Sequence, residues 1–318
     1  MSKNSISYEN NLILMNKSRR QRKIKESVIG YLYVMPVIVG ILVFTLFPVL
    51  YSLESSFFEY DMSAMKFTDF VGFANYLKPF QSGLVGYLFW KSMRVTFLYA
   101  LINIPLTLVL SFLLALFLNR SLKGIRFFRT LYYLPVLIPA VCNGLIWKNI
   151  TNKDFGIANS ILEKLGFPAW SWFEQVRTAM PSFIFIGMFS LGGGMILWLA
   201  QLKNVPKSLY ESAKLDGAGS FKQLISITIP MCTPMIFYNI IMSLIGTLQT
   251  FTQVQVLTDG SGPSYSLHFY IMNVYNIMNS SHDMGYASAL SFILFIIIGL
   301  LTLLVFKTNK WVYYGDEN

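Results

Sequence analysis

Long uncharged stretches alternate with short polar segments along most of this 318-residue chain. Six stretches contain no Asp, Glu, Lys or Arg: Val28–Leu53, Val95–Leu118, Thr130–Trp147, Thr178–Leu202, Leu224–Leu257 and Met284–Phe306. A helix needs about 20 apolar residues to cross the hydrocarbon core of a bilayer, and the fifth stretch is longer than that. The pattern therefore predicts an all-α membrane protein with six transmembrane helices.

The composition supports this interpretation. The chain is 54% hydrophobic and only 13% charged, whereas soluble domains are about 45–50% apolar and about 25% charged. The first stretch is too long for the core of a signal peptide and no small-residue cleavage site follows it, so we expect an uncleaved first span. Cys142 and Cys232 both lie in or at apolar segments, which argues against a disulfide framework.

The distribution of basic residues predicts the topology. Six spans place both termini on one side of the membrane, and 17 of the 25 Lys and Arg residues fall on that side. Basic residues concentrate on the cytoplasmic side of membrane proteins, so the termini and the connection between the fourth and fifth spans are predicted to be cytoplasmic. The basic residues are spread over four segments, which argues against a nucleic-acid-binding patch. The predicted organisation is a basic segment (1–27), a membrane domain (28–310) and a tail (311–318).

A polar connection, residues 204–230, joins the fourth and fifth spans. Ser208 followed by Glu211 has the spacing of a capping box, which starts a helix. Gly217 is expected to end that helix, because glycine adopts the left-handed conformation found at helix C-termini. The resulting helix, Leu209–Asp216, would be only about 12 Å long. A helix this short is not stable by itself, so it must dock on a neighbour.

The remainder of this connection predicts a second helix. Ser220 and Gln223 form another capping box, and Pro230 is expected to turn the chain sharply into the next span. By local physics alone, a well-capped surface loop explains the whole segment as well as a docking element does.

The segment resembles the cytoplasmic coupling loop of the permease subunits of ATP-binding-cassette importers. That family pattern is E-A-A, three residues, G, nine residues and I-x-L-P, and here it is matched by Glu211, Ser212, Ala213, Gly217, Ile227, Thr228, Ile229 and Pro230. Ser212 and Ile229 depart from alanine and leucine. The resemblance implies that a separate ATPase is contacted by Glu211, Ser212, Ala213, Asp216, Gly217, Ile227 and Pro230.

Further segments resemble the carbohydrate-uptake branch of that family, the maltose and glycerol-phosphate type. They are V-G-F-A-N-Y (71–76), L-N-R-S-L-K-G-I-R-F-F-R-T-L-Y-Y-L-P (118–135), D-F-G (154–156), P-K-S-L-Y-E-S-A-K-L-D-G-A (206–218) and L-T-D-G-S-G-P (257–263). Asp259 and Ser261 replace two glycines of the usual last motif. For Trp170 and Trp172, an interfacial aromatic belt is the simpler explanation.

The resemblance also implies partners and a mechanism. It implies a second homologous permease subunit, two ATPase subunits that bind ATP and magnesium, and an extracytoplasmic sugar-binding protein. The chain would form half of an alternating-access pathway for a disaccharide or oligosaccharide in the cell membrane. It would bind no cofactor, metal or nucleic acid itself.

Motifs for independent chemistry are absent from the sequence. It contains no G-x-x-x-x-G-K-[ST] loop for nucleotide, no H-E-x-x-H for zinc and no G-x-S-x-G nucleophile turn. No charged residue or histidine lies deep within a predicted span, where proton- or sodium-coupled carriers commonly keep such groups. His268 and His282 are expected to be solvated or interfacial. We therefore predict no catalytic residues and no enzyme activity.

A polar stripe in the fifth span is the candidate substrate pathway. Its members recur every three or four residues and would share one helix face: Asn239, Ser243, Thr247, Thr250 and Gln253. Asn103 and Asn143 on the second and third spans are candidate additions. Hydrogen bonding between helices explains the stripe equally well. The run Gly192–Gly194 in the fourth span indicates close helix packing or, as the less favoured alternative, a local break in the helix.

Two other functions remain open from the residues alone. A self-contained secondary carrier or facilitator for a neutral polar solute would need no nucleotide. An intramembrane hydrolase is a more remote alternative, because the sequence shows no paired nucleophile and base.

Overall fold

The computed structural model describes residues 25–61, 66–120 and 123–313, and these are mostly helical. Most of the predicted basic N-terminal segment and the end of the tail lie outside the described residues. Three helices are long and apolar enough to cross a membrane: Lys25–Ser55, Leu84–Leu118 and Met284–Lys307. Three bent helix pairs complete a set of up to six spans, as expected from the hydropathy pattern.

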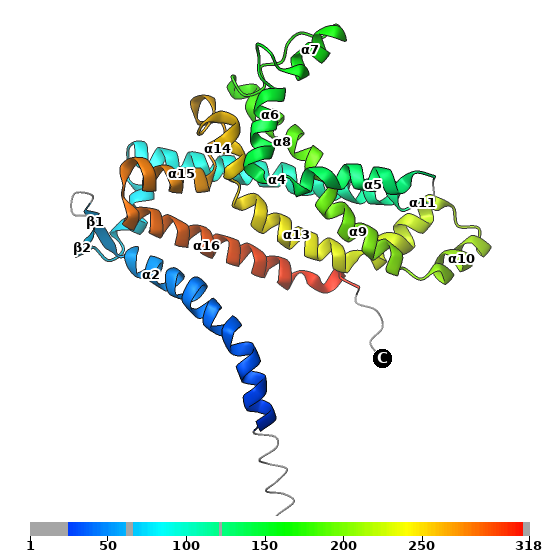
Figure 1. Ribbon diagram of the computed structural model, residues 1–318, viewed down its shortest axis with the longest axis horizontal. Helices are drawn as coiled ribbons and strands as arrows, with labels where there is room; N and C mark the ends of the chain where they lie inside the picture. The colour runs from blue at the N-terminus through cyan, green and yellow to red at the C-terminus, as the bar shows by residue number, and fades with distance from the viewer. Residues whose placement is uncertain (1–24, 62–65, 121–122, 314–318) are drawn as a thin grey trace, which may run out of the picture.

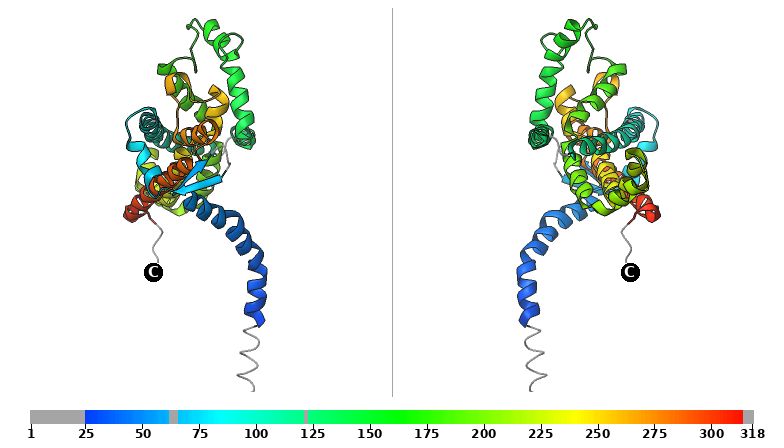
Figure 2. Two further views of the ribbon diagram at one scale, coloured as in Figure 1. Left: turned by 90° about the vertical axis from the view of Figure 1, so that its left-hand side faces the viewer. Right: turned by 90° about the vertical axis from the view of Figure 1, so that its right-hand side faces the viewer.

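The first span extends away from the body of the protein (Figures 1 and 2). It runs from Lys25 to Ser55 and includes a π-helical turn, Leu42–Leu46, followed by α2, Phe47–Ser55. The most apolar part of this helix is not buried by any other part of the described chain. Its side chains therefore need lipid or another protein as a neighbour.

The second and sixth spans are single helices. The second, α4 (Leu84–Leu118), begins eleven residues before the predicted start at Val95 and includes Lys91 and Arg94. At 1.5 Å per residue α4 is about 50 Å long, which exceeds the roughly 30 Å hydrocarbon core. The sixth, α16 (Met284–Lys307), matches its predicted range. The Asp283 side chain caps α16 by accepting a hydrogen bond from the Tyr286 N–H at 2.9 Å.

The third span is bent by 102°. Its parts are α5 (Ile125–Tyr133), a 3-10 turn (Leu134–Leu137) and α6 (Ala140–Ile150). The span is not one straight helix, because a residue before proline is disfavoured in the helical conformation. Ile138 precedes Pro139 and is extended, with ψ of 126°.

The fourth span is bent by 46° at its glycine run. It consists of α8 (Val176–Gly187), a 3-10 turn (Met188–Ser190) and α9 (Gly192–Asn204). A Cβ on Gly192 would lie 2.1 Å from the Tyr132 carbonyl oxygen, so α5 packs directly on the α9 backbone. The favoured expectation of close packing is confirmed, and the break that was the alternative is present as well.

The fifth span consists of several short helices. They are α11 (Ser220–Gln223), a π-helical turn (Leu224–Thr228), α12 (Ile229–Met231), α13 (Thr233–Leu248) and α14 (Thr252–Thr258). The expected turn at Pro230 is wrong: Pro230 lies inside α12, and the 65° bend lies between Met231 and Thr233. Pro230 lies two residues after the π-helical turn ends at Thr228 and one residue before the end of the continuous helix Ser220–Met231, so the bend comes after it.

Short elements connect the spans. Strands β1 (Phe58–Asp61) and β2 (Lys66–Phe70) form an antiparallel pair, which departs from the all-α expectation. The remaining elements are α3 (Ala74–Leu77), the 3-10 turn Lys78–Phe80, α7 (Ile157–Lys164), the 3-10 turn Pro263–Tyr265, α15 (Tyr270–Asn276), the π-helical turn Ile277–Ser281 and the 3-10 turn Asn309–Trp311.

Helix α4 runs through all three clusters of buried side chains. One cluster joins α4 to α8, α14 and α15, a second joins it to α9 and α13, and a third joins its first turns to α15 and α16. The predicted tail begins in contact with the body, because the Tyr313 N–H donates to the Thr233 hydroxyl at 2.8 Å.

Candidate functional site

The polar connection between spans four and five contains the short helix α10, Lys207–Leu215 (Figure 1). Its N-cap is Pro206, and no side chain caps it. The predicted capping box is therefore wrong, since Ser208 occupies the second helical position. The φ of Pro206 is fixed by its ring, and its carbonyl accepts the Leu209 N–H at 3.3 Å. The helix therefore starts at Lys207, two residues before the predicted start at Leu209.

The end of α10 has the predicted geometry. Gly217 has φ of +73°, the left-handed region. Its N–H donates to the Lys214 carbonyl at 3.1 Å, and the Ala218 N–H donates to the Ala213 carbonyl at 2.8 Å. These two bonds form a Schellman motif, which satisfies carbonyls at the helix end. The prediction that Gly217 stops the helix is confirmed.

A side-chain contact links α10 to the fifth span. The Tyr210 hydroxyl lies 2.9 Å from the Thr228 hydroxyl, which is in the π-helical turn before α12. The second capping box is absent, because Gly219 caps α11 and the Gln223 amide donates to the Ala218 carbonyl instead. The connection thus folds back on itself as one unit. It exposes Glu211, Ser212, Asp216 and Gly217, and Leu215 is 90% exposed.

A cavity of about 250 Å³ lies between α4, the bend of span four and α13. Its polar lining contains two predicted residues, Asn239 and Ser243, together with residues that sequence reasoning missed: Thr107, Ser111 and Ser190. Thr107 and Ser111 are four residues apart on α4, a spacing that places both on one helix face and that is visible in the sequence. The Asn239 amide nitrogen donates to the Met235 carbonyl at 2.8 Å, which leaves its oxygen as an acceptor.

The predicted stripe is not one helix face. Helix α13 ends at Leu248, so Thr250 lies in a non-helical segment and Gln253 lies on α14. Thr247 is buried one turn beyond the cavity lining. The stripe was predicted from the spacing of residues on one continuous helix, and this spacing has no such meaning beyond the end of α13 at Leu248.

The two asparagines added from other spans also lie outside the cavity lining. Asn103 is one turn before Thr107 on α4, near Gly187. Asn143 is on α6, which packs against α14.

A family model described as the binding-protein-dependent transport system inner membrane component matches residues 96–312. The chain belongs to this family. It is 35% identical over 308 residues to the probable ABC transporter permease protein YesP of Bacillus subtilis, covering 95% of this chain and 97% of that protein. It is 29% identical to the trehalose/maltose transport system permease protein MalF of Thermococcus litoralis, covering 93% and 98%.

Solved structures show the same fold. A bacterial alginate ABC transporter, crystallised with its alginate-bound periplasmic protein, contains a chain that aligns with a TM-score of 0.77 at 20% identity. The alignment covers 91% of this permease and 96% of that chain. The family, the relatives and this fold identify a multi-pass membrane protein, and the relatives are permease subunits of ABC transporters.

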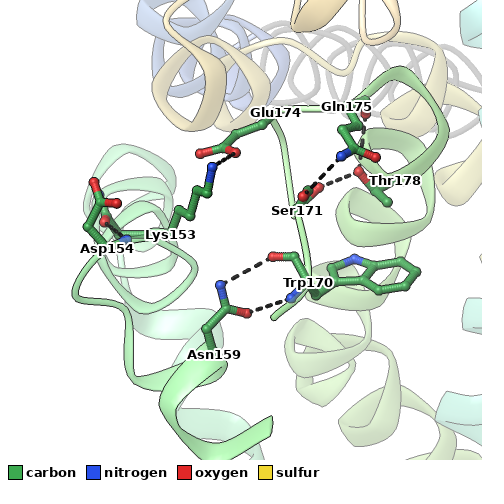
Figure 3. A network of polar contacts seen from close by, with 9 residues as sticks. Lys153, Asp154, Asn159, Trp170, Ser171, Glu174, Gln175 and Thr178 are labelled. Carbon is green, nitrogen blue, oxygen red and sulfur yellow. Dashed lines mark hydrogen bonds and ion pairs between the residues drawn. The ribbon is translucent and has the colours of Figure 1, made fainter. Parts of the chain in front are cut away.

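The loop between α6 and α8, which contains α7, is held by side-chain hydrogen bonds (Figure 3). The Asn159 amide nitrogen donates to the Trp170 carbonyl at 3.2 Å. The Asn159 oxygen accepts the Trp170 backbone N–H at 3.0 Å and the Trp172 indole N–H at 2.9 Å. Lys153 pairs with Glu174 at 3.5 Å. The two tryptophans, expected as an aromatic belt, are thus also part of the loop's polar framework.

His268 is fully buried, so the expectation of a solvated or interfacial histidine is wrong for this residue. Its Nδ1 lies 2.6 Å from the Ser261 hydroxyl and its Nε2 lies 3.2 Å from the Asn273 side-chain oxygen. The pairing of a hydroxyl with an imidazole, which the sequence did not indicate, therefore exists. The buried ring gives a substrate no access to it, and the contacts instead join the segment before α15 to that helix.

Burial lowers the pKa of His268, and the nearby charge of Lys91 lowers it further, while the Asn273 hydrogen bond opposes both effects. The unfolded chain then binds more protons than the folded chain below pH about 6.5, so stability falls as the pH decreases through that range. We expect the thermal midpoint of the purified permease to be lower at pH 5.5 than at pH 7.5. His268→Gln should flatten this dependence and His282→Gln should not; an unchanged slope in the first variant would contradict it.

Proposed function

We propose that this permease is a transmembrane subunit of an ATP-driven carbohydrate importer, and that α10 is the site where a separate ATPase subunit drives it. The observation that carries this proposal is the exposed nine-residue helix, ended by Gly217 and placed between two bent spans. An isolated helix of this length is unstable in water, and the 90% exposed Leu215 is a natural contact for a partner. Glu211 and Asp216 supply charges beside it.

The contacts of α10 provide a path for movement. Tyr210 connects α10 to Thr228, two residues before Pro230 in α12. The Gln201 amide of α9 donates to the Met231 carbonyl at the end of α12, at 2.8 Å. A displacement of α10 would therefore be passed through α12 to both α9 and α13, which line the 250 Å³ cavity. In this proposal the bends at the glycine run and at Cys232 act as the hinges of alternating access.

The proposed importer needs a second permease, two ATPase subunits and a sugar-binding protein in addition to this chain. We place a second, homologous permease in the complex, and the unburied first span offers it an apolar surface. ATP and magnesium would be bound by two ATPase subunits on the cytoplasmic side, where the termini are also placed. An extracytoplasmic sugar-binding protein would deliver the substrate to the opposite side.

A neutral disaccharide or oligosaccharide is the proposed substrate. The similar proteins include an arabinooligosaccharide permease of Bacillus subtilis, 30% identical over 88% of this chain. The hydroxyl and amide groups of Thr107, Asn239 and Ser243 suit sugar hydroxyls, and no charged side chain lines this cavity.

Filling the cavity tests the pathway. Ser243→Phe is expected to reduce ATP-driven sugar uptake at least about tenfold, because the ring occupies much of a 250 Å³ space. Leu244→Phe, one position along α13 and outside the cavity lining, is the control and should retain uptake. Uptake is measured with radiolabelled sugar in proteoliposomes that contain the complete transporter. Equal uptake by the two variants would exclude this cavity from the pathway.

Reconstitution tests the function as a whole. The permease alone in liposomes is expected to move no sugar, and uptake should require the ATPase, the second permease, the binding protein and ATP. Uptake by this chain alone would contradict the proposal and favour a secondary carrier or facilitator.

A further inference from the structure

A second cavity, of about 320 Å³, lies where the start of α4, the end of α15 and the start of α16 meet. We call it the Lys78–Tyr286 pocket, after two of the residues that line it. It shares no lining residue with the cavity between α4 and α13. It is therefore separate from the proposed sugar pathway.

Two buried polar groups of this pocket lack a partner among the described residues. Asn273 is 2% exposed and Tyr286 is 3% exposed. The Asn273 oxygen is used by His268, but its amide nitrogen has no acceptor, and the Tyr286 hydroxyl has no partner. A buried polar group without a hydrogen bond is costly and rare in folded proteins. Both side chains line the pocket, and these two buried atoms have no hydrogen-bond partner among the described residues.

A lysine places positive charge beside these two groups. The Lys78 ammonium is 2.6 Å from one Asp283 carboxylate oxygen and 5.2 Å from the centre of the Tyr286 ring. The other Asp283 oxygen accepts the Tyr286 N–H at the start of α16. Asp283 is thus engaged on both oxygens, whereas an ammonium has three N–H donors and this ion pair uses one. Lys78, Asn273 and Tyr286 together form a donor set suited to the oxygen atoms of a phosphate group.

The opposite wall is apolar and open. Leu84 and Val85, in the first turn of α4, line the pocket and are exposed. Nearby, the exposed rings of Phe80 and Trp90 contact each other with centroids 5.9 Å apart. Exposed aromatic rings are typical of the membrane–water interface. The apolar helix α16 begins at this pocket, because Asp283 and Tyr286 line it. A ligand here would have its polar part among the donors and an acyl chain along α4.

We infer that the Lys78–Tyr286 pocket binds the phosphate headgroup of a membrane phospholipid. The phosphate oxygens accept hydrogen bonds from Tyr286 and Asn273 and lie beside the Lys78 ammonium. The acyl chains follow the exposed aliphatic wall. A bound lipid would then join the segment before α4, α15 and α16 at one end of the spans.

The experiment uses the full chain with its co-purifying subunits, freed of lipid in mild detergent. Phosphatidylglycerol and phosphatidylethanolamine are titrated separately, with inorganic phosphate and glycerol 3-phosphate as the arms that lack acyl chains. Native mass spectrometry measures bound lipid and a thermal unfolding assay measures protection. The wild-type protein is expected to bind lipid and gain thermal stability from it, and the two phosphate arms are expected to give no protection at the same concentrations.

Tyr286→Phe is the decisive variant, because it removes the unpaired hydroxyl and keeps the ring. It should unfold at the wild-type temperature or higher without lipid, and its lipid affinity should fall about tenfold, which is the loss of one good hydrogen bond. Lys78→Gln should weaken binding to a similar extent. Lys153→Gln removes another ion-paired lysine far from this pocket and should bind as wild type.

Three results would overturn the inference. Tyr286→Phe with wild-type lipid affinity would show that the hydroxyl meets no headgroup. Equal loss in Lys153→Gln would show that the effect is one of general charge. Full protection by inorganic phosphate alone would assign the donors to a free anion and not to a lipid.

Discussion

Gly217→Pro is expected to abolish nucleotide-driven transport while the protein still inserts into the membrane. Gly217 has φ of +73°, and proline is restricted to φ of about −65°, so the ring cannot adopt this backbone. Proline also removes the N–H that bonds the Lys214 carbonyl at 3.1 Å. Both effects destroy the Schellman motif that ends α10, and α10 would then lose its orientation relative to Thr228. The spans do not depend on this loop for their hydrophobic burial, so insertion should persist.

The measurement is ATP hydrolysis by the complete transporter in proteoliposomes, with and without the sugar-loaded binding protein. Stimulation should be lost in Gly217→Pro and retained in Gly219→Ala. Gly219 has φ of −67°, and a methyl group added there would meet no atom within 4 Å, so alanine fits without strain. Normal stimulated hydrolysis in Gly217→Pro would refute the role of α10 as the connection to the ATPase.

Gly192→Ala is expected to destabilise the permease by about 2–3 kcal/mol, in the range known for overpacked cores. A Cβ at this position would lie 2.1 Å from the Tyr132 carbonyl oxygen and 2.9 Å from its carbon. These are backbone atoms, so no side-chain rotation can relieve the contact. Helices α5 and α9 must separate, and Leu191 and Gly194, which line the cavity, move with α9.

Gly193→Ala is the matched control, because its nearest atom is a Val136 methyl at an ordinary 3.7 Å. Thermal unfolding in detergent is expected to show a clearly lower midpoint for Gly192→Ala and little change for Gly193→Ala. Transport at saturating sugar should fall only in the first variant. Equal midpoints for the two variants would mean that α5 does not pack on Gly192 as closely as described.

The polar connection, residues 204–230, shows which structural features can be predicted from neighbouring residues alone. Gly217 was identified correctly because the left-handed conformation is a property of one residue and its neighbours. The two capping boxes were wrong because Ser208 and Ser220 compete with Pro206 and Gly219 for the cap position, and a spacing of three residues does not decide that competition. The Tyr210–Thr228 contact spans eighteen residues and has no local signature.

The histidine cluster shows a different limit. Ser261, His268 and Asn273 are separated by loops and a helix start, so no periodic pattern brings them together. Burial of His268 depends on α4 and α8 packing over the segment before α15. A sequence of this kind therefore leaves the exposure of a single polar residue undetermined.

The sequence by itself determined the membrane-spanning class, the approximate positions of the six apolar segments and the stop at Gly217. Hydrophobic length and single-residue backbone preference suffice for those features. Only the tertiary structure decided where three of the spans bend, which polar groups of α4 and α13 share a cavity, and which buried donors on α15 and at the start of α16 lack a partner. Those features depend on contacts between distant segments, because the direction of a side chain follows from the packing of whole helices and not from its neighbours in the chain.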